Sequence, residues 1–79
     1  MAIIKNHRRD FMQDINKIVR QNIRKFRLQR DLTQEKLAYS AKLHRAYIGQ
    51  VERGEKKIGL TNLQKIANAL KTDIKKFLD

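Results

Sequence analysis

The sequence has no cysteine, no proline, no tryptophan and three glycines among its 79 residues. Without cysteine, the chain cannot form a disulfide scaffold, a cysteine-ligated metal site or a thiol redox centre. It also has no apolar run near the length of about 20 residues that a membrane-spanning helix needs. Because proline and glycine are the residues that most often break helices, their scarcity favours an all-α chain.

Acidic residues are also few, with 8 Asp and Glu against 19 Lys and Arg, which gives a net charge of +11. So positive a chain predicts a polyanionic partner, and we place nucleic acid ahead of an anionic membrane surface. The length allows one domain with a small core. The apolar start, Met1 to Ile4, is too short for a signal peptide and basic residues follow it, so we expect a cytoplasmic protein.

Helical periodicity dominates the chain. Apolar residues recur at three- and four-residue steps from Phe11 to Phe26, which predicts a first helix capped by Asp10 in a capping box with Gln13. Residues 1–9 show no such periodicity. We therefore assign residues 1–12 to a mobile basic arm and residues 13–79 to one helix-turn-helix DNA-binding domain, as argued below.

Four shorter helices are expected after the first, which makes five helices and no strand. Thr33, Thr61 and Asp73 are expected to cap three of them, and His44 or Arg45 is expected to begin the other. Gly54 is expected to end the third helix. The second and third helices are joined by a tight turn, and this pattern is typical of a helix-turn-helix unit. Ala38 matters most there, because a larger side chain would push the two helices apart.

The segment from about Ile23 to Leu78 resembles the lambda-repressor-like (Cro/CI, XRE) helix-turn-helix family. Three stretches carry the resemblance: Leu32-Thr33-Gln34-Glu35-Lys36-Leu37-Ala38, Tyr47-Ile48-Gly49-Gln50-Val51-Glu52-Arg53-Gly54 and Leu63-Gln64-Lys65-Ile66-Ala67-Asn68-Ala69-Leu70. Within the family, the segments 43–48 and 51–54 are most similar to the controller proteins of restriction–modification systems.

The resemblance implies a five-helix fold whose third helix enters the major groove of double-stranded DNA. It also implies a homodimer on a palindromic operator near a promoter. Such a regulator represses by blocking RNA polymerase or activates by contacting it. An antitoxin or a phage-type repressor is the alternative within DNA binding. Outside it, the alternative is a non-catalytic basic module that binds a protein or a membrane.

The resemblance also assigns residues. The implied DNA contacts are Gln34, His44, Arg45, Ala46, Tyr47, Gln50, Arg53, Lys56 and Lys57. Arg45 suits guanine because its planar guanidinium matches the O6 and N7 acceptors. Arg27 and Glu52 match the positions of a structural ion pair.

Five further residues have two interpretations or depart from the family. Ile74, Phe77 and Leu78 match the usual dimer interface, although they could instead close the core of the monomer. Lys42 stands in the turn where the family prefers glycine, which predicts mild strain. Gly49, inside the third helix, fits either close approach to DNA or close packing against a neighbouring helix.

An enzyme is not expected. His7 and His44 lack the spacing of metal ligands, there is no cysteine nucleophile, and the acidic residues are too scattered for a catalytic carboxylate pair. We expect no metal and no cofactor.

Overall fold

A computed structural model describes the backbone of residues 2–79 and the side chains of residues 15–79. Four α-helices and a terminal 3₁₀ helix follow one another along the chain: α1 (Ala2–Gln29), α2 (Gln34–Ala41), α3 (Arg45–Glu52), α4 (Leu60–Ala69) and η1 (Ile74–Leu78). Residues 2–79 contain no strand, so the expected all-α fold is confirmed. None of the helices described is long and apolar enough to cross a bilayer.

The fifth predicted helix is a 3₁₀ helix of five residues rather than an α-helix. A segment this short can complete few of the i to i+4 hydrogen bonds of an α-helix, and the tighter 3₁₀ turn is common in such pieces. Asp73 is its N-cap as predicted, because the carboxylate accepts a hydrogen bond from the backbone N–H of Lys75 at 2.9 Å.

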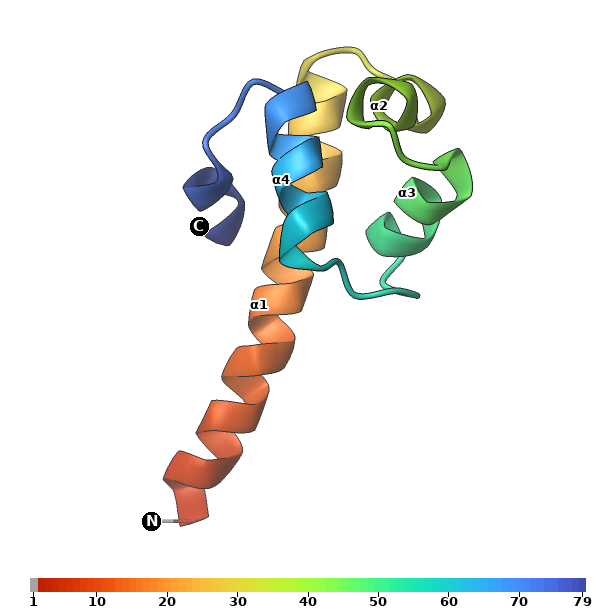
Figure 1. Ribbon diagram of the computed structural model, residues 1–79. Helices are drawn as coiled ribbons and strands as arrows, with labels where there is room; N and C mark the ends of the chain where they lie inside the picture. The colour runs from red at the N-terminus through yellow and green to blue at the C-terminus, as the bar shows by residue number, and fades with distance from the viewer. Residues whose placement is uncertain (1) are drawn as a thin grey trace.

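The predicted start of the first helix is wrong. α1 begins at Ala2 and runs without a break to Gln29, so Asp10 lies inside the helix and is not its N-cap. Neither glycine nor proline occurs between residues 2 and 29 to interrupt it, and apolar periodicity is not needed where helix propensity suffices. In Figure 1, α1 reaches well beyond the other helices at its N-terminal end. The division into an arm, 1–12, and a domain, 13–79, stays a prediction.

The core lies where the C-terminal half of α1 meets the other elements. It is built from twelve buried apolar side chains, which are Val19, Ile23, Leu37, Ala38, Ala41, Ile48, Val51, Leu63, Ile66, Ala67, Leu70 and Phe77. Ala38 is buried between α2 and its neighbours as the helix-turn-helix pattern predicts. This small residue lets α2 and α3 pack closely, and the core thereby fixes the angle at which α3 is presented.

Phe77 belongs to the core of the monomer. It has no solvent-exposed surface, and its ring meets that of Phe26 edge to face with centroids 5.0 Å apart. Phe77 therefore has the second of its two expected roles, because it closes the core of its own monomer. Ile74 is half-buried against the same core, whereas Leu78 keeps 54 % of its surface exposed.

Local capping fixes the α2–turn–α3 unit. The Thr33 hydroxyl accepts a hydrogen bond from the N–H of Lys36 at 3.0 Å, so this predicted N-cap is confirmed. α3 begins at Arg45, and His44 is its N-cap because His44 Nδ1 accepts a hydrogen bond from the N–H of Ala46 at 3.1 Å. Lys42 adopts the left-handed conformation, with φ 59° and ψ 42°, at the end of α2. A lysine there bears the steric cost that a glycine would avoid.

The N-cap of α4 differs from the prediction. α4 begins at Leu60 with Gly59 as its N-cap, so Thr61 lies in the first turn. Gly59 has no side chain to cap the helix, and the first backbone N–H groups of α4 are not satisfied by a capping side chain.

Candidate nucleic-acid interface

A buried ion pair fixes α3 against α1. Arg27, from α1, donates from Nε and Nη2 to the two carboxylate oxygens of Glu52 on α3, at 2.7 and 2.9 Å. The two side chains are 8 % and 3 % exposed. Arg27 Nη1 also donates to the carbonyl of Leu32 at 2.8 Å, which ties the entry of α2 to the same point. The structure thus places this pair where it supports the fold and not on the surface.

Gln34 joins the same network from the first position of α2. Its side-chain amide donates to Glu52 Oε1 at 3.1 Å, so one carboxylate links α1, α2 and α3. Gln34 was expected to contact DNA, and its side chain is half-buried, with the amide bonded to the buried ion pair.

Gly49 packs closely within the same unit. A Cβ atom at Gly49 would lie 3.0 Å from Arg53 Nη1 and 3.3 Å from Gln34 Oε1. Both neighbours are the ends of long side chains, and Gly49 itself lines the open depression between α2 and α3.

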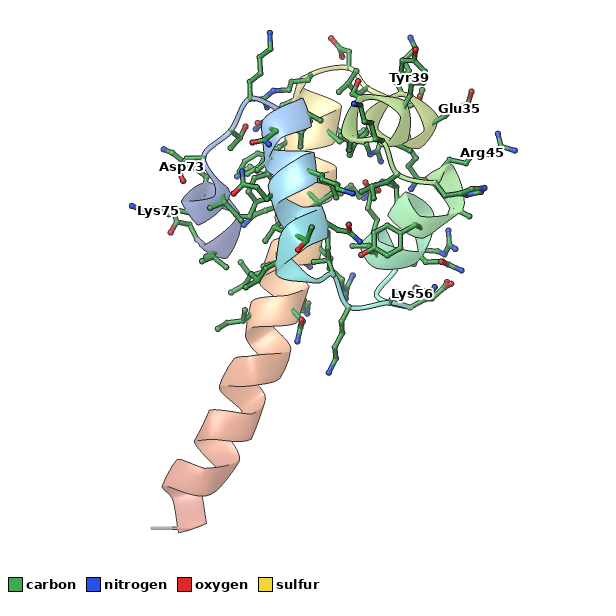
Figure 2. All side chains as sticks on the ribbon, viewed as in Figure 1. Glu35, Tyr39, Arg45, Lys56, Asp73 and Lys75 are labelled. Carbon is green, nitrogen blue, oxygen red and sulfur yellow. The ribbon has the colours of Figure 1, made fainter. Side chains whose placement is uncertain are left out.

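The outer face of α3 carries polar groups that solvent can reach. Arg45, Ala46, Gln50 and Arg53 line one open depression together with the first residues of α2. Figure 2 shows Arg45 and Glu35 extending to the same side of the molecule, away from α1 and α4. The face therefore presents guanidinium and amide donors outward beside a short, exposed methyl group.

Arg45 has an acidic neighbour that the sequence did not reveal. Arg45 Nη1 lies 2.9 Å from Glu35 Oε2, and both side chains are 70 % exposed. An ion pair this exposed is weak, because water solvates each charge almost as well as the partner does. Arg45 can therefore exchange Glu35 for a base or a phosphate.

Arg53 is paired in the same way, with Glu55 just beyond the end of α3. Its guanidinium donates from Nε and Nη2 to the two Glu55 oxygens at 2.5 and 3.2 Å. The hydrogen bond with Arg53, reinforced by the opposite charge, lowers the pKa of Glu55 below its ordinary value. The same contact raises the pKa of Arg53.

The loop between α3 and α4 adds the remaining expected contacts. Lys56 and Lys57 are exposed there. Tyr47, on the first turn of α3, is half-buried against the core, and its hydroxyl accepts a hydrogen bond from Asn62 Nδ2 at 3.1 Å. Asn62 carried no signal in the sequence, because its contact spans 15 residues and depends on how α4 crosses α3.

Comparison with known proteins gives one family and several relatives. Residues 23–77 match the model of the helix-turn-helix family. The chain is 45 % identical to control protein C.SmaI of Serratia marcescens over 82 % of its length and 77 % of that protein. It is 43 % identical to control protein C.BamHI of Bacillus amyloliquefaciens, over 75 % of this chain and 74 % of that one.

A solved structure of a related protein has the same fold. The restriction-modification controller protein C.AhdI of Aeromonas hydrophila superposes with a TM-score of 0.75 at 37 % identity, covering 82 % of this chain and 97 % of that one. None of these three relatives is named as an enzyme.

Proposed function

Since the chain belongs to the helix-turn-helix family, in which its relatives are controller proteins, we propose that it regulates a restriction–modification system. Members of this family are DNA-binding transcription regulators, and this chain is one of them. The restriction–modification setting is the finer part of the proposal. It is supported by the identity with two control proteins across three quarters or more of the chain.

One observation carries the DNA-binding mode. The only buried ionic network of residues 15–79 stands behind α3, and exposed Arg45 and Arg53 stand in front of it. α3 is thus held rigidly from one side and offers cationic donors on the other. A recognition helix in a major groove needs this arrangement, because its base contacts depend on a fixed approach to the duplex.

The individual roles follow from chemistry and exposure. Arg45 would read guanine through its planar fork, while Ala46 would contact a thymine methyl group or leave its base unread. Gln50 and Tyr47 would face flanking bases or the backbone. Arg53, Lys56 and Lys57 would contact phosphates, and the N-cap residue His44 would lie at the groove edge.

We also propose that the chain acts as a homodimer on a two-fold symmetric operator. Leu78 is the exposed apolar residue of η1 and half-buried Ile74 lies on the same short helix, so this segment remains the candidate interface without Phe77. Leu78→Asp should shift sedimentation toward the monomer and leave helicity intact. Phe77→Ala should instead lower helicity and thermal stability, since it removes core packing.

Selection of bound sequences from random duplex DNA tests the proposal. We expect a symmetric site that the protein binds on the order of a thousand-fold more tightly than scrambled DNA at the same salt concentration. A gel shift alone would not suffice, because a chain of charge +11 binds any duplex weakly through counterion release. If no selected site exceeds scrambled DNA by even tenfold, the regulator proposal fails.

A further inference from the structure

We propose that Asn62 is a positioning residue of the DNA-binding surface: its amide holds the Tyr47 hydroxyl so that this hydroxyl donates a hydrogen bond to a phosphate oxygen of the duplex. This inference rests on the proposed function. It assigns a role to α4, whose residues were not expected at the site.

The geometry fixes Tyr47 at both ends of its side chain. The ring is half-buried and packs against the core, and the hydroxyl oxygen lies 3.1 Å from Asn62 Nδ2. Asn62 is itself half-buried in the first turn of α4. Two helices that are separate in sequence therefore set the position of one hydroxyl group, and this group needs no reordering when a ligand arrives.

The direction of the hydrogen bond determines what the hydroxyl can bind. A phenol has one hydrogen to donate, and here its oxygen is the acceptor for Asn62. No residue of the described side-chain range, 15–79, accepts the hydroxyl hydrogen. An accepted hydrogen bond polarises the hydroxyl and strengthens it as a donor. The Tyr47 hydroxyl is thus prepared for an acceptor from outside the chain.

The surroundings favour an anionic acceptor. Lys56 and Lys57 are exposed on the loop that connects α3 to α4. The start of α4, which contains Asn62, has no capping side chain, so the positive end of its dipole adds to the charge of the two lysines. A phosphate oxygen of the DNA backbone meets both conditions, because it is an acceptor and it is negatively charged.

A purely structural role for the hydrogen bond, as a tie between α3 and α4, makes different predictions. That role would affect thermal stability, and it would leave the DNA affinity of the folded protein unchanged. Tyr47→Phe removes the hydroxyl and keeps the ring in the core, so it separates the two roles. Asn68→Ala is the matched control, because Asn68 is also on α4 but is exposed and pairs with Gln64.

The experiment measures affinity for the selected operator and for scrambled duplex over a range of salt concentrations, with a melting curve for each variant. The variants are Tyr47→Phe, Asn62→Ala, the double variant and Asn68→Ala. We expect Tyr47→Phe to weaken binding to both duplexes by about tenfold. Asn62→Ala should weaken it in the same direction but less, and the double variant should match Tyr47→Phe. The salt dependence should not change, because the lost group is neutral.

Asn62→Asp sharpens the test. Its carboxylate would take the hydroxyl hydrogen and repel a phosphate, so it should bind more weakly than Asn62→Ala, beyond the small general effect of one added negative charge. Asn68→Asp measures that general effect.

Two results would overturn the inference. If the losses of Tyr47→Phe and Asn62→Ala add in the double variant, Asn62 does not act through Tyr47. If the variants lower the melting temperature but bind DNA as the wild type does, the hydrogen bond is only a tie between helices. Failure of the wild-type chain to prefer any selected site would contradict the proposed function instead, and it is seen before any variant is compared.

Discussion

Three arginines of this chain each pair with a glutamate, yet one pair is buried and the other two are exposed. Arg27 and Glu52 are almost completely buried between α1 and α3, whereas Arg45 and Glu35 are 70 % exposed on the outer face of α2 and α3. Arg53 and Glu55 are exposed as well. The same two side-chain types therefore support the fold in one place and remain available to a ligand in the other, and burial decides which.

The buried pair is stable because its hydrogen-bonding groups are matched. The Glu52 carboxylate accepts from Arg27 and Gln34, and the third arm of Arg27 donates to the carbonyl of Leu32. Removing these charges from water is costly, and this full set of partners offsets the cost. The exposed pairs have water as an alternative partner, so DNA can replace either glutamate at little cost.

Breaking the buried pair should give the largest effect. Glu52→Ala leaves the Arg27 guanidinium buried without its partner, and we expect a loss of about 3–5 kcal/mol in the free energy of unfolding. Denaturant titration followed by circular dichroism measures it, with Glu35→Ala as the control. Equal losses for the two variants would mean that burial does not distinguish the pairs.

Removing the exposed Arg45 should change recognition and not folding. Arg45→Ala should lose the proposed bidentate contact with guanine, which corresponds to about 1–3 kcal/mol of discrimination at one position of each half-site. The melting temperature should stay near that of the wild type. Competition among operator variants measures the preference, and an unchanged preference at every position would remove Arg45 as the base-reading residue.

The pair with Glu35 should contribute little to stability. We expect Glu35→Ala to change the free energy of unfolding by only about 0–1 kcal/mol, because both partners are solvated. Its affinity for any duplex should rise, since an acidic group is removed from the surface proposed to face DNA. A tightly coupled pair would instead show a stability loss similar to that of Glu52→Ala.

The smallest effect concerns the pH dependence of Glu55. Because the contact with Arg53 lowers the folded-state pKa of Glu55, its stabilising effect is present above the unfolded-state pKa and is lost as pH falls through the folded-state value. In Arg53→Ala the carboxyl should titrate at higher pH than in the wild type. NMR titration of the Glu55 side-chain carboxyl carbon measures this pKa in both proteins. Identical titration midpoints would show that the contact is not formed in solution.

Periodicity and capping chemistry predicted much of the fold. Ala38, the N-caps Thr33 and Asp73, and the start of α3 at Arg45 are local features, and they are as predicted. The start of α1 was not predictable from apolar spacing, because that end of the helix forms without a repeating apolar face. The burial of Phe77 depends on a ring contact with Phe26 far away in sequence.

The candidate site was predictable only in part, because some of its contacts depend on how the helices pack against one another. The exposed residues of α3 could be identified from the resemblance, and the structure places Arg45 and Arg53 on one open face. The partners Glu35 and Asn62 were missed because their contacts depend on how α2 and α4 lie against α3. Helix periodicity indicates which side of a helix is buried, but it does not indicate which residue of the next helix lies opposite.

The three-way contact at Glu52 has a consequence for the thermodynamics of binding. Because one carboxylate joins α1, α2 and α3, the backbone of α3 is already ordered before a duplex arrives. Binding then has to restrict only the long side chains at the surface, at about 0.5–1.5 kcal/mol for each one immobilised. The conformational entropy lost on association is thus concentrated in a few arginine and lysine rotamers.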